Sequence, residues 1–289
     1  MSSSRFDLVD DGVQVGGLVN GSAGRGRPLL VCLHGGGYNS GYFDLPGHSL
    51  LDRGERNGFK VLALDRLSYG ATDAYEGDDV FEANTRVVGS AIGRIWETSA
   101  DPHCGVIVVG QPIGAVIALL IAAQHPQWPL LGVSVTGIAD DPPAEVVGAW
   151  TSVPTGVPVT LDEEQRRGML FGAEGSFDPG VVSLSQELAE LAQVRELVEV
   201  VELWPDLFRT VAGEIDVPVH LVLTEFEKLW VTGQEAVAGM AARFTNSPRI
   251  DSDYFVAVGH NIDHHHLGEA LHLEQLAFAL RCAVPGSGA

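Results

Sequence analysis

The segment Val106–Ala118 constrains the fold of this chain more than any other. It reads Val-Ile-Val-Val-Gly-Gln-Pro-Ile-Gly-Ala-Val-Ile-Ala, so four apolar β-formers run into Gly110 and small apolar residues at helical spacing follow from Gly114. Two apolar runs separated by glycines predict a buried strand that turns sharply into a buried helix. Such a unit requires a sheet whose strands are covered by helices.

The turn in this unit has the spacing of a nucleophile elbow, in which Gly-x-Ser-x-Gly holds a serine on a strained strand-to-helix turn. Here the pattern is Gly110-Gln111-Pro112-Ile113-Gly114. Proline is fixed at a φ of about −65° and lacks an N–H. We therefore expect Pro112 to be the first helical residue, with Gln111 extended before it. This helix start leaves free N–H groups at Ile113 and Gly114, which attract anions.

Short apolar runs alternate with segments of helical pattern along most of the chain. Residues 6–19 alternate loosely and break at glycines, which predicts an antiparallel hairpin. Continuous apolar strands alternating with helices are typical of a parallel sheet covered on both faces. We therefore predict an α/β fold with a mostly parallel central sheet. The expected strands span residues 28–33, 59–65, 105–110, 131–136, 217–223 and 253–258, and the expected helices span 81–97, 234–244 and a last stretch ending at 280.

Residues 140–215 have a different pattern, with several prolines and no strand-like run. Thr160–Glu163 has a capping-box signature, and a long amphipathic helix is expected from Ser183 to Val201. We predict that this segment is a helical lid over the carboxyl edge of the sheet, where α/β folds bind ligands. The core then consists of residues 1–139 and 216–289.

A run of three glycines, Gly35–Gly37, follows the first core strand directly. Glycines there allow backbone N–H groups to face a ligand, as an oxyanion hole requires. A tight turn without function is the alternative interpretation. The predicted substrate-binding residues, from this loop and the elbow, are Gly36, Gly37, Tyr38, Gln111, Pro112 and Ile113.

In this order the parts resemble the α/β-hydrolase superfamily over nearly the whole chain. The order is strand, His-Gly-Gly-Gly, strand, Asp-Arg-x-x-x-Gly, strand, elbow, lid, strand with an acid, and strand with Gly-His. The resemblance implies an α/β-hydrolase fold in which nucleophile, acid and histidine follow one another along the chain. It implies that His260 is the histidine and Glu227 the acid, with Glu225 as a second candidate. The implied oxyanion donors are the N–H groups of Gly36 or Gly37 and of Ile113.

The departure from the family pattern at Pro112 decides which chemistry is expected. Proline has no group that can form an acyl-enzyme, which excludes ordinary serine esterase chemistry at this elbow. No other nucleophile is placed by a motif, so Ser68, Ser134 or Thr136 would have to be brought near by the fold. A His260–Glu227 dyad still has the means for general acid–base catalysis.

We therefore predict a non-covalent enzyme of lyase, isomerase or cyclase type that acts on a small, mostly apolar carbonyl compound. A role in secondary-metabolite biosynthesis is a further hypothesis. The first alternative is a catalytically dead ligand-binding pseudoenzyme. The second is a hydrolase in which water attacks directly.

Composition narrows the range of partners. The 17 basic and 38 acidic residues give a formal charge of −21, which disfavours nucleic acid and anionic membrane surfaces. No signal-peptide pattern precedes the first hairpin, and the apolar run Ala115–Ala123 is too short to span a bilayer. With three cysteines at no metal-type spacing, a cytoplasmic protein is expected. Homodimer formation stays open.

The tract His264–His266 resembles a metal-binding sequence by composition. Adjacent residues of a helix point about 100° apart, so these three side chains cannot share one ion. We therefore expect no metal site in this tract, and no cofactor in the protein.

Overall fold

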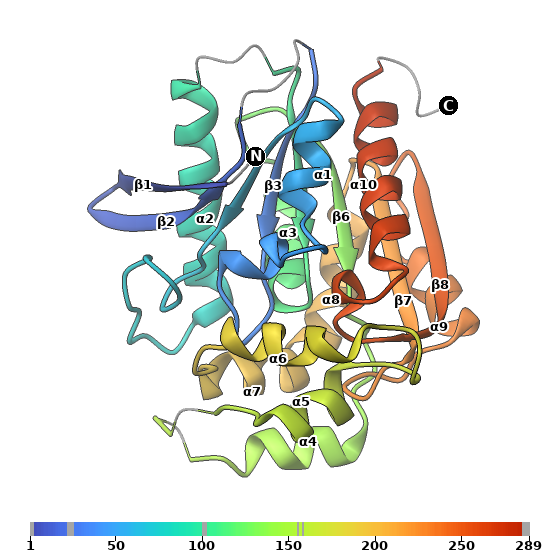
Figure 1. The fold of residues 1–289 in the computed structure, drawn as a ribbon. Coiled ribbons are helices and arrows are strands. Elements are labelled where there is room, and N and C mark those ends of the chain that lie inside the picture. The colour runs from blue at the N-terminus through green and yellow to red at the C-terminus, as the bar shows by residue number, and fades with distance from the viewer. Residues whose placement is uncertain (1–2, 22–25, 100–102, 155, 158, 285–289) are drawn as a thin grey trace.

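The computed structural model describes residues 3–21, 26–99, 103–154, 156–157 and 159–284. An eight-stranded sheet of order β1-β2-β4-β3-β5-β6-β7-β8 crosses the molecule (Figure 1). The hairpin β1–β2 and the pair β2–β4 are antiparallel, and all other neighbours are parallel. The strands are β1 Ser4–Asp10, β2 Val13–Val19, β3 Leu29–Leu33, β4 Lys60–Leu64, β5 Val106–Gly110, β6 Leu130–Thr136, β7 Val219–Phe226 and β8 Ile250–Gly259. The predicted hairpin and strands are therefore confirmed, each to within a few residues.

Strand β3 shows why the sheet needs cover on both faces. Its residues Leu29, Val31 and Leu33 pack into one core, whereas Leu30 and Cys32 pack into a second core on the opposite face. This is the alternation that a pleated strand imposes, here with both sides apolar. Helices α2 Val80–Thr98, α3 Ile113–Ala123, α8 Trp204–Glu214 and α9 Gln234–Ala241 contribute to the first core, and α1 Leu50–Arg56 and α10 Gly268–Cys282 contribute to the second; helices of the segment 140–215 also add residues to both cores. The predicted mostly parallel sheet with helices on both faces is confirmed.

The segment predicted as an insertion is helical throughout most of its length. Figure 1 shows α4, α5, α6 and α7 gathered at one end of the sheet. The last helix, α8, buries Trp204 and Phe208 in the first core beside α3. The helices of the end group are α4 Ala144–Thr151, α5 Glu163–Leu170, α6 Pro179–Glu187 and α7 Val194–Glu202.

Two details predicted for this segment are wrong. The capping box at α5 is formed by Asp162 and Gln165, each side chain bonding the other's backbone N–H, two residues beyond the expected cap. The single long helix is two helices, α6 and α7, because the residues between them find partners elsewhere. Glu190 N–H donates to the Gly37 carbonyl at 2.9 Å, and Ala192 pairs with Val159 in an isolated bridge. Helical periodicity alone does not reveal backbone partners that are distant in sequence and that replace the hydrogen bonds of a continuous helix.

Among the described helices, none has both the length and the apolar composition needed to cross a membrane.

Candidate active site

A pocket lies between the carboxyl ends of the central strands and the helical segment. The loops after β3, β5, β7 and β8 form its floor, and residues of α4, α5 and α7 form its roof. The space between its walls, including the mouth, is about 800 Å³. All six predicted substrate-binding residues line it, together with His260. Its apolar walls are formed by Val146, Trp150, Val159, Leu161, Met169, Leu170, Ala192, Leu197, Val200, Val201, Leu229 and Trp230.

His260 follows β8 and is hydrogen-bonded to the acid that follows β7. The distance from His260 Nδ1 to Glu227 Oε2 is 2.7 Å, and the two side chains are only 5% and 1% exposed. The other carboxylate oxygen of Glu227 accepts the N–H groups of Lys228 and Leu229 at 2.9 and 2.8 Å. Because three donors converge on it, the carboxylate has a fixed position, which in turn fixes the imidazole ring.

The second candidate for the acid lies elsewhere. Glu225 is exposed, and its carboxylate accepts the N–H of Ala257 at 2.8 Å. That bond holds a point of β8 where the pairing with β7 is irregular and Ala257 has a φ of 65°. Glu225 therefore has a structural contact, and Glu227 is the carboxylate beside the histidine.

The turn between β5 and α3 begins the helix as expected, but with one fewer free donor. Pro112 has helical angles, φ −35° and ψ −61°, and its carbonyl accepts the N–H of Val116. Gly114 N–H donates to the Gln111 carbonyl at 2.9 Å, so the predicted free N–H at Gly114 is wrong. Of the two N–H groups predicted to be free, Ile113 N–H is therefore the one that has no acceptor among the described residues.

The glycine loop also has N–H groups without an acceptor among the described residues. Gly37 N–H donates to the Tyr69 hydroxyl at 3.4 Å, whereas Gly36 N–H has no acceptor in the described part of the chain. Gly36 and Ile113 are neighbours across the pocket, because a Cβ built on Gly36 would lie 3.8 Å from Ile113 Cδ1. Because they lie on neighbouring loops and have no acceptor, these two N–H groups are the candidate donors of an oxyanion hole.

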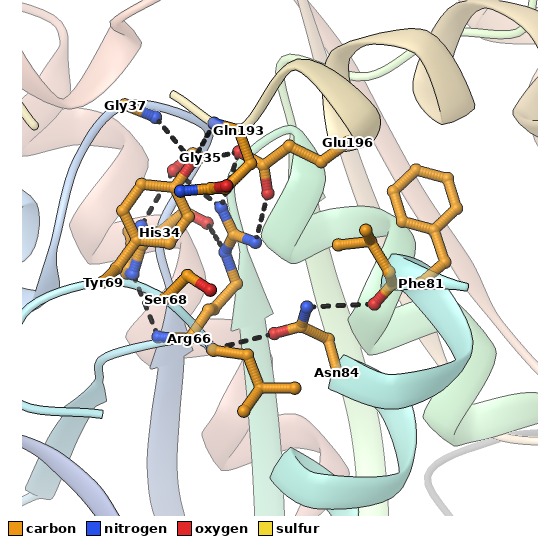
Figure 2. A network of polar contacts seen from close by, with 12 residues as sticks. His34, Gly35, Gly37, Arg66, Ser68, Tyr69, Phe81, Asn84, Gln193 and Glu196 are labelled. Carbon is orange, nitrogen blue, oxygen red and sulfur yellow. Dashed lines mark hydrogen bonds and ion pairs between the residues drawn. The ribbon is translucent and has the colours of Figure 1, made fainter. Parts of the chain in front are cut away.

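A buried ion pair holds the glycine loop from behind (Figure 2). Arg66 and Glu196 are both 0% exposed, with Arg66 Nη1 2.8 Å from Glu196 Oε2. Arg66 also donates to the carbonyls of His34 and Gly35 at 2.8 and 3.0 Å, and the Tyr69 hydroxyl donates to Glu196. Although burial opposes it, Glu196 raises the pKa of Arg66, so the guanidinium stays charged.

The network joins three separate parts of the chain. His34 and Gly35 follow β3, Arg66 follows β4, and Glu196 comes from α7 in the helical segment. Burial raises the pKa of the Tyr69 phenol, and Glu196 raises it further, so its hydroxyl keeps the proton it donates. The position of the glycine loop is thus coupled to the position of α7.

The other hydroxyl side chains considered as nucleophiles do not reach the pocket. Ser68 Oγ accepts the N–H of Tyr75, and Ser134 Oγ contacts His220 at 2.8 Å within the second core. Neither of them, nor Thr136, lines the pocket.

Some polar residues of the pocket were missed by the sequence patterns. Asn261, next to His260, donates from Nδ2 to the Tyr38 hydroxyl at 2.6 Å. Three polar side-chain atoms of pocket residues are enclosed without a hydrogen-bond partner in the described structure: Gln111 Oε1, Trp230 Nε1 and Asn261 Oδ1. Unpaired buried polar atoms are rare in folded proteins and mark a place where a ligand or water is expected.

The three consecutive histidines have separate contacts. His264 Nε2 lies 3.1 Å from the Tyr42 carbonyl, and His265 Nε2 accepts the N–H groups of Gly172 and Gly259. In the described chain, no group of three potential ligands is arranged to hold a metal ion. Burial lowers the pKa of both His264 and His265 to about 4.

The lowered pKa values of His264 and His265 predict that the protein loses stability in mild acid. An unfolded histidine has a pKa of about 6.5, so between pH 6.5 and 4 the unfolded chain binds more protons and the free energy of unfolding falls as pH falls. The limiting loss is about 3 kcal/mol per histidine. Calorimetry between pH 7.5 and 4.5 measures it as a falling Tm. His264→Phe should give a shallower slope of Tm against pH, and His125→Asn, at an exposed position, should leave that slope unchanged. A wild-type Tm that does not change with pH would contradict the expectation.

Comparison with known proteins agrees with this architecture. The sequence model described as "Alpha/beta hydrolase family" matches residues 30–272. No curated protein matches the chain.

Solved structures show the same fold at low sequence identity. A monoglyceride lipase from Saccharomyces cerevisiae has a TM-score of 0.72 at 12% identity, over 98% of this chain and 96% of its own. A thermophilic esterase from Thermogutta terrifontis has a TM-score of 0.70 at 14% identity, over 97% of this chain and 100% of its own. An enol-lactonase from Burkholderia xenovorans has a TM-score of 0.69 at 14% identity, over 95% of this chain and 99% of its own.

Proposed function

Because this chain belongs to the Alpha/beta hydrolase family, we propose that its pocket is the active site of an enzyme that uses His260 and Glu227 for general acid–base catalysis without a covalent intermediate. The observation that carries the proposal is the 2.7 Å contact between His260 Nδ1 and Glu227 Oε2 in a pocket whose elbow position holds Pro112. The proposed substrate is a small, mostly apolar carbonyl compound, and the proposed reaction is of lyase, isomerase or cyclase type.

The hydrogen bonds of the dyad give each nitrogen of His260 a role. Since Glu227 accepts from Nδ1, the proton of the neutral ring resides there and Nε2 carries the lone pair. Nε2 takes a proton from the carbon next to the substrate carbonyl, and the carboxylate stabilises the imidazolium that results. The same imidazolium returns the proton to another atom of the product. Such proton transfer typically contributes about 10²–10⁴-fold to a rate.

The negative charge that develops on the carbonyl oxygen also needs a partner. The N–H groups of Gly36 and Ile113 are the donors proposed for that oxygen, because neither has another acceptor in the described chain. Fixed donors in a water-poor site stabilise an enolate more than water does.

The direct test is a screen in labelled water. Ketones, β-diketones and enol lactones are incubated with the protein in D₂O and, separately, in H₂¹⁸O, with the His260→Asn variant beside the wild type. Deuterium at the carbon next to the carbonyl, absent with His260→Asn, supports the proposal. If the wild type and His260→Asn give the same isotope incorporation for every compound tested, a ligand-binding pseudoenzyme is favoured instead.

Direct attack by water is the second candidate function. It is favoured by the three similar structures, since these are an esterase, a lipase and an enol-lactonase. In it, Nε2 of His260 takes a proton from water while the oxygen bonds to the carbonyl carbon. One ¹⁸O atom in the carboxylate product identifies hydrolysis, and its absence together with proton exchange identifies the first reaction.

Restoring the family's hydroxyl is expected to restore little esterase activity. Residue 112 has helical angles and lies in the first turn of α3, so a serine there inherits a rebuilt turn instead of the strained one. Pro112→Ser should hydrolyse p-nitrophenyl acetate less than about tenfold faster than the wild type. The double variant Pro112→Ser/His260→Ala is the control, and a large gain that needs His260 would show that the turn is permissive.

A further inference from the structure

A buried arginine without a carboxylate partner lines the pocket. Arg166, on α5, is 3% exposed. Its Nε donates to Gln186 Oε1 at 2.9 Å, its Nη1 donates to the Tyr38 hydroxyl, and its guanidinium carbon lies 4.9 Å from the centre of the Tyr38 ring. Its Nη2 has no acceptor among the described residues. All of its described partners are therefore uncharged.

This arrangement contrasts with that of Arg66, the other buried arginine among the described residues. Arg66 has a carboxylate, Glu196, at 2.8 Å, and two carbonyls besides. A buried charge without an opposite charge is costly, and proteins normally pair it. The missing partner of Arg166 is thus an anion that the described chain does not supply.

Glu190, the one carboxylate among the described residues that line the same pocket, is engaged elsewhere. Glu190 Oε1 accepts from Asn39 Nδ2 at 2.6 Å, and its carboxylate also accepts the N–H of Gly70. These contacts hold it at the glycine-loop side, and it forms no ion pair with Arg166 in the described structure. The overall charge of −21 opposes the approach of anions, so any preference for them must be local.

The unpaired guanidinium is close to the proposed base. The Tyr38 hydroxyl accepts from both Arg166 and Asn261, and Asn261 is the residue after His260. One hydroxyl thus links the cation to the segment that holds the imidazole. Apolar residues, among them Leu170 and Trp230, line the same pocket.

We infer that Arg166 is a carboxylate-binding residue of this pocket and that the substrates are small carbonyl compounds with a carboxylate at one end. A guanidinium donates two parallel hydrogen bonds to a carboxylate, which fixes orientation as well as charge. The carboxylate at Arg166 then directs the carbonyl end of the molecule toward His260. The substrate class rests on the proposed function, whereas the binding preference for anions does not.

The test compares acids with their neutral amides. Straight-chain 4-oxocarboxylates of five to ten carbons and the corresponding amides are titrated into the protein by calorimetry. The wild type should bind at least one acid about tenfold or more tightly than its amide. Arg166→Met should reduce this ratio to less than about twofold. Arg167→Met, which alters the exposed neighbour paired with Glu174, should retain the wild-type ratio.

The wild-type comparison stands even where a variant fails to fold. If no acid of the series binds more tightly than its amide, the inference is wrong, and it is equally wrong if folded Arg166→Met keeps the preference. His260→Asn separates this result from the proposed catalysis, because it should keep the preference for acids. If the preference for acids is retained but neither the wild type nor any variant turns over a substrate, the catalytic proposal is contradicted and the proposed anion site is not.

Discussion

Replacing Glu196 by glutamine is expected to destabilise the protein by about 3–5 kcal/mol, the typical cost of removing one partner of a buried ion pair. Arg66 would remain 0% exposed with its carboxylate gone, and the Tyr69 hydroxyl would lose a charged acceptor. Chemical denaturation followed by circular dichroism measures the loss. Glu202→Gln, an exposed position of the same helix, should change stability by less than about 0.5 kcal/mol.

The double variant Arg66→Met/Glu196→Met compares the cost of an uncompensated buried charge with the cost of lost hydrogen bonds. Apolar residues of similar volume often replace a buried ion pair at no net cost, so the double variant should be more stable than Glu196→Gln alone. A double variant no more stable than the single one would show that losing the hydrogen bonds to His34 and Gly35 costs at least as much as the isolated charge.

The parts of this fold that the sequence predicts are those set by local pattern. The unit Val106–Ala118 is continuous in the chain, so its strand, glycines and helix are readable from one segment. The dyad was implied by the resemblance to the α/β-hydrolase superfamily, and the fold gives the physical reason: parallel strands bring their carboxyl ends to one edge, which places the residues after β7 and β8 together. Glu225 and Glu227 were separable only by their contacts, because both lie at the carboxyl end of β7.

The parts that the sequence does not predict depend on residues far apart. Arg66 and Glu196 are 130 positions apart, and only the fold brings them together. The break between α6 and α7 has the same origin, since Glu190 N–H bonds to Gly37 in a distant loop. Helix α5 has a polar sequence typical of a solvated surface, so nothing in its pattern indicates that Arg166 is buried.

Glu227→Gln is expected to reduce turnover by about 10²–10⁴-fold while ligand binding is retained. The glutamine keeps the size of the side chain and one oxygen for the N–H groups of Lys228 and Leu229. Its amide nitrogen then faces His260 Nδ1 and donates to it. The ring proton must move to Nε2, so the nitrogen that faces the pocket no longer has a lone pair.

This variant is informative because it alters the ring's proton without removing the ring. Rates are measured on a substrate found in the labelled-water screen, with calorimetry for binding. Glu225→Gln is the matched control, and its rate should stay within about twofold of the wild type, since the exposed side chain retains an oxygen for Ala257 N–H. Loss of turnover in Glu227→Gln with unchanged affinity indicates that the carboxylate acts through the tautomer of His260. Equal rates in both variants would mean that the 2.7 Å contact only holds the two loops together.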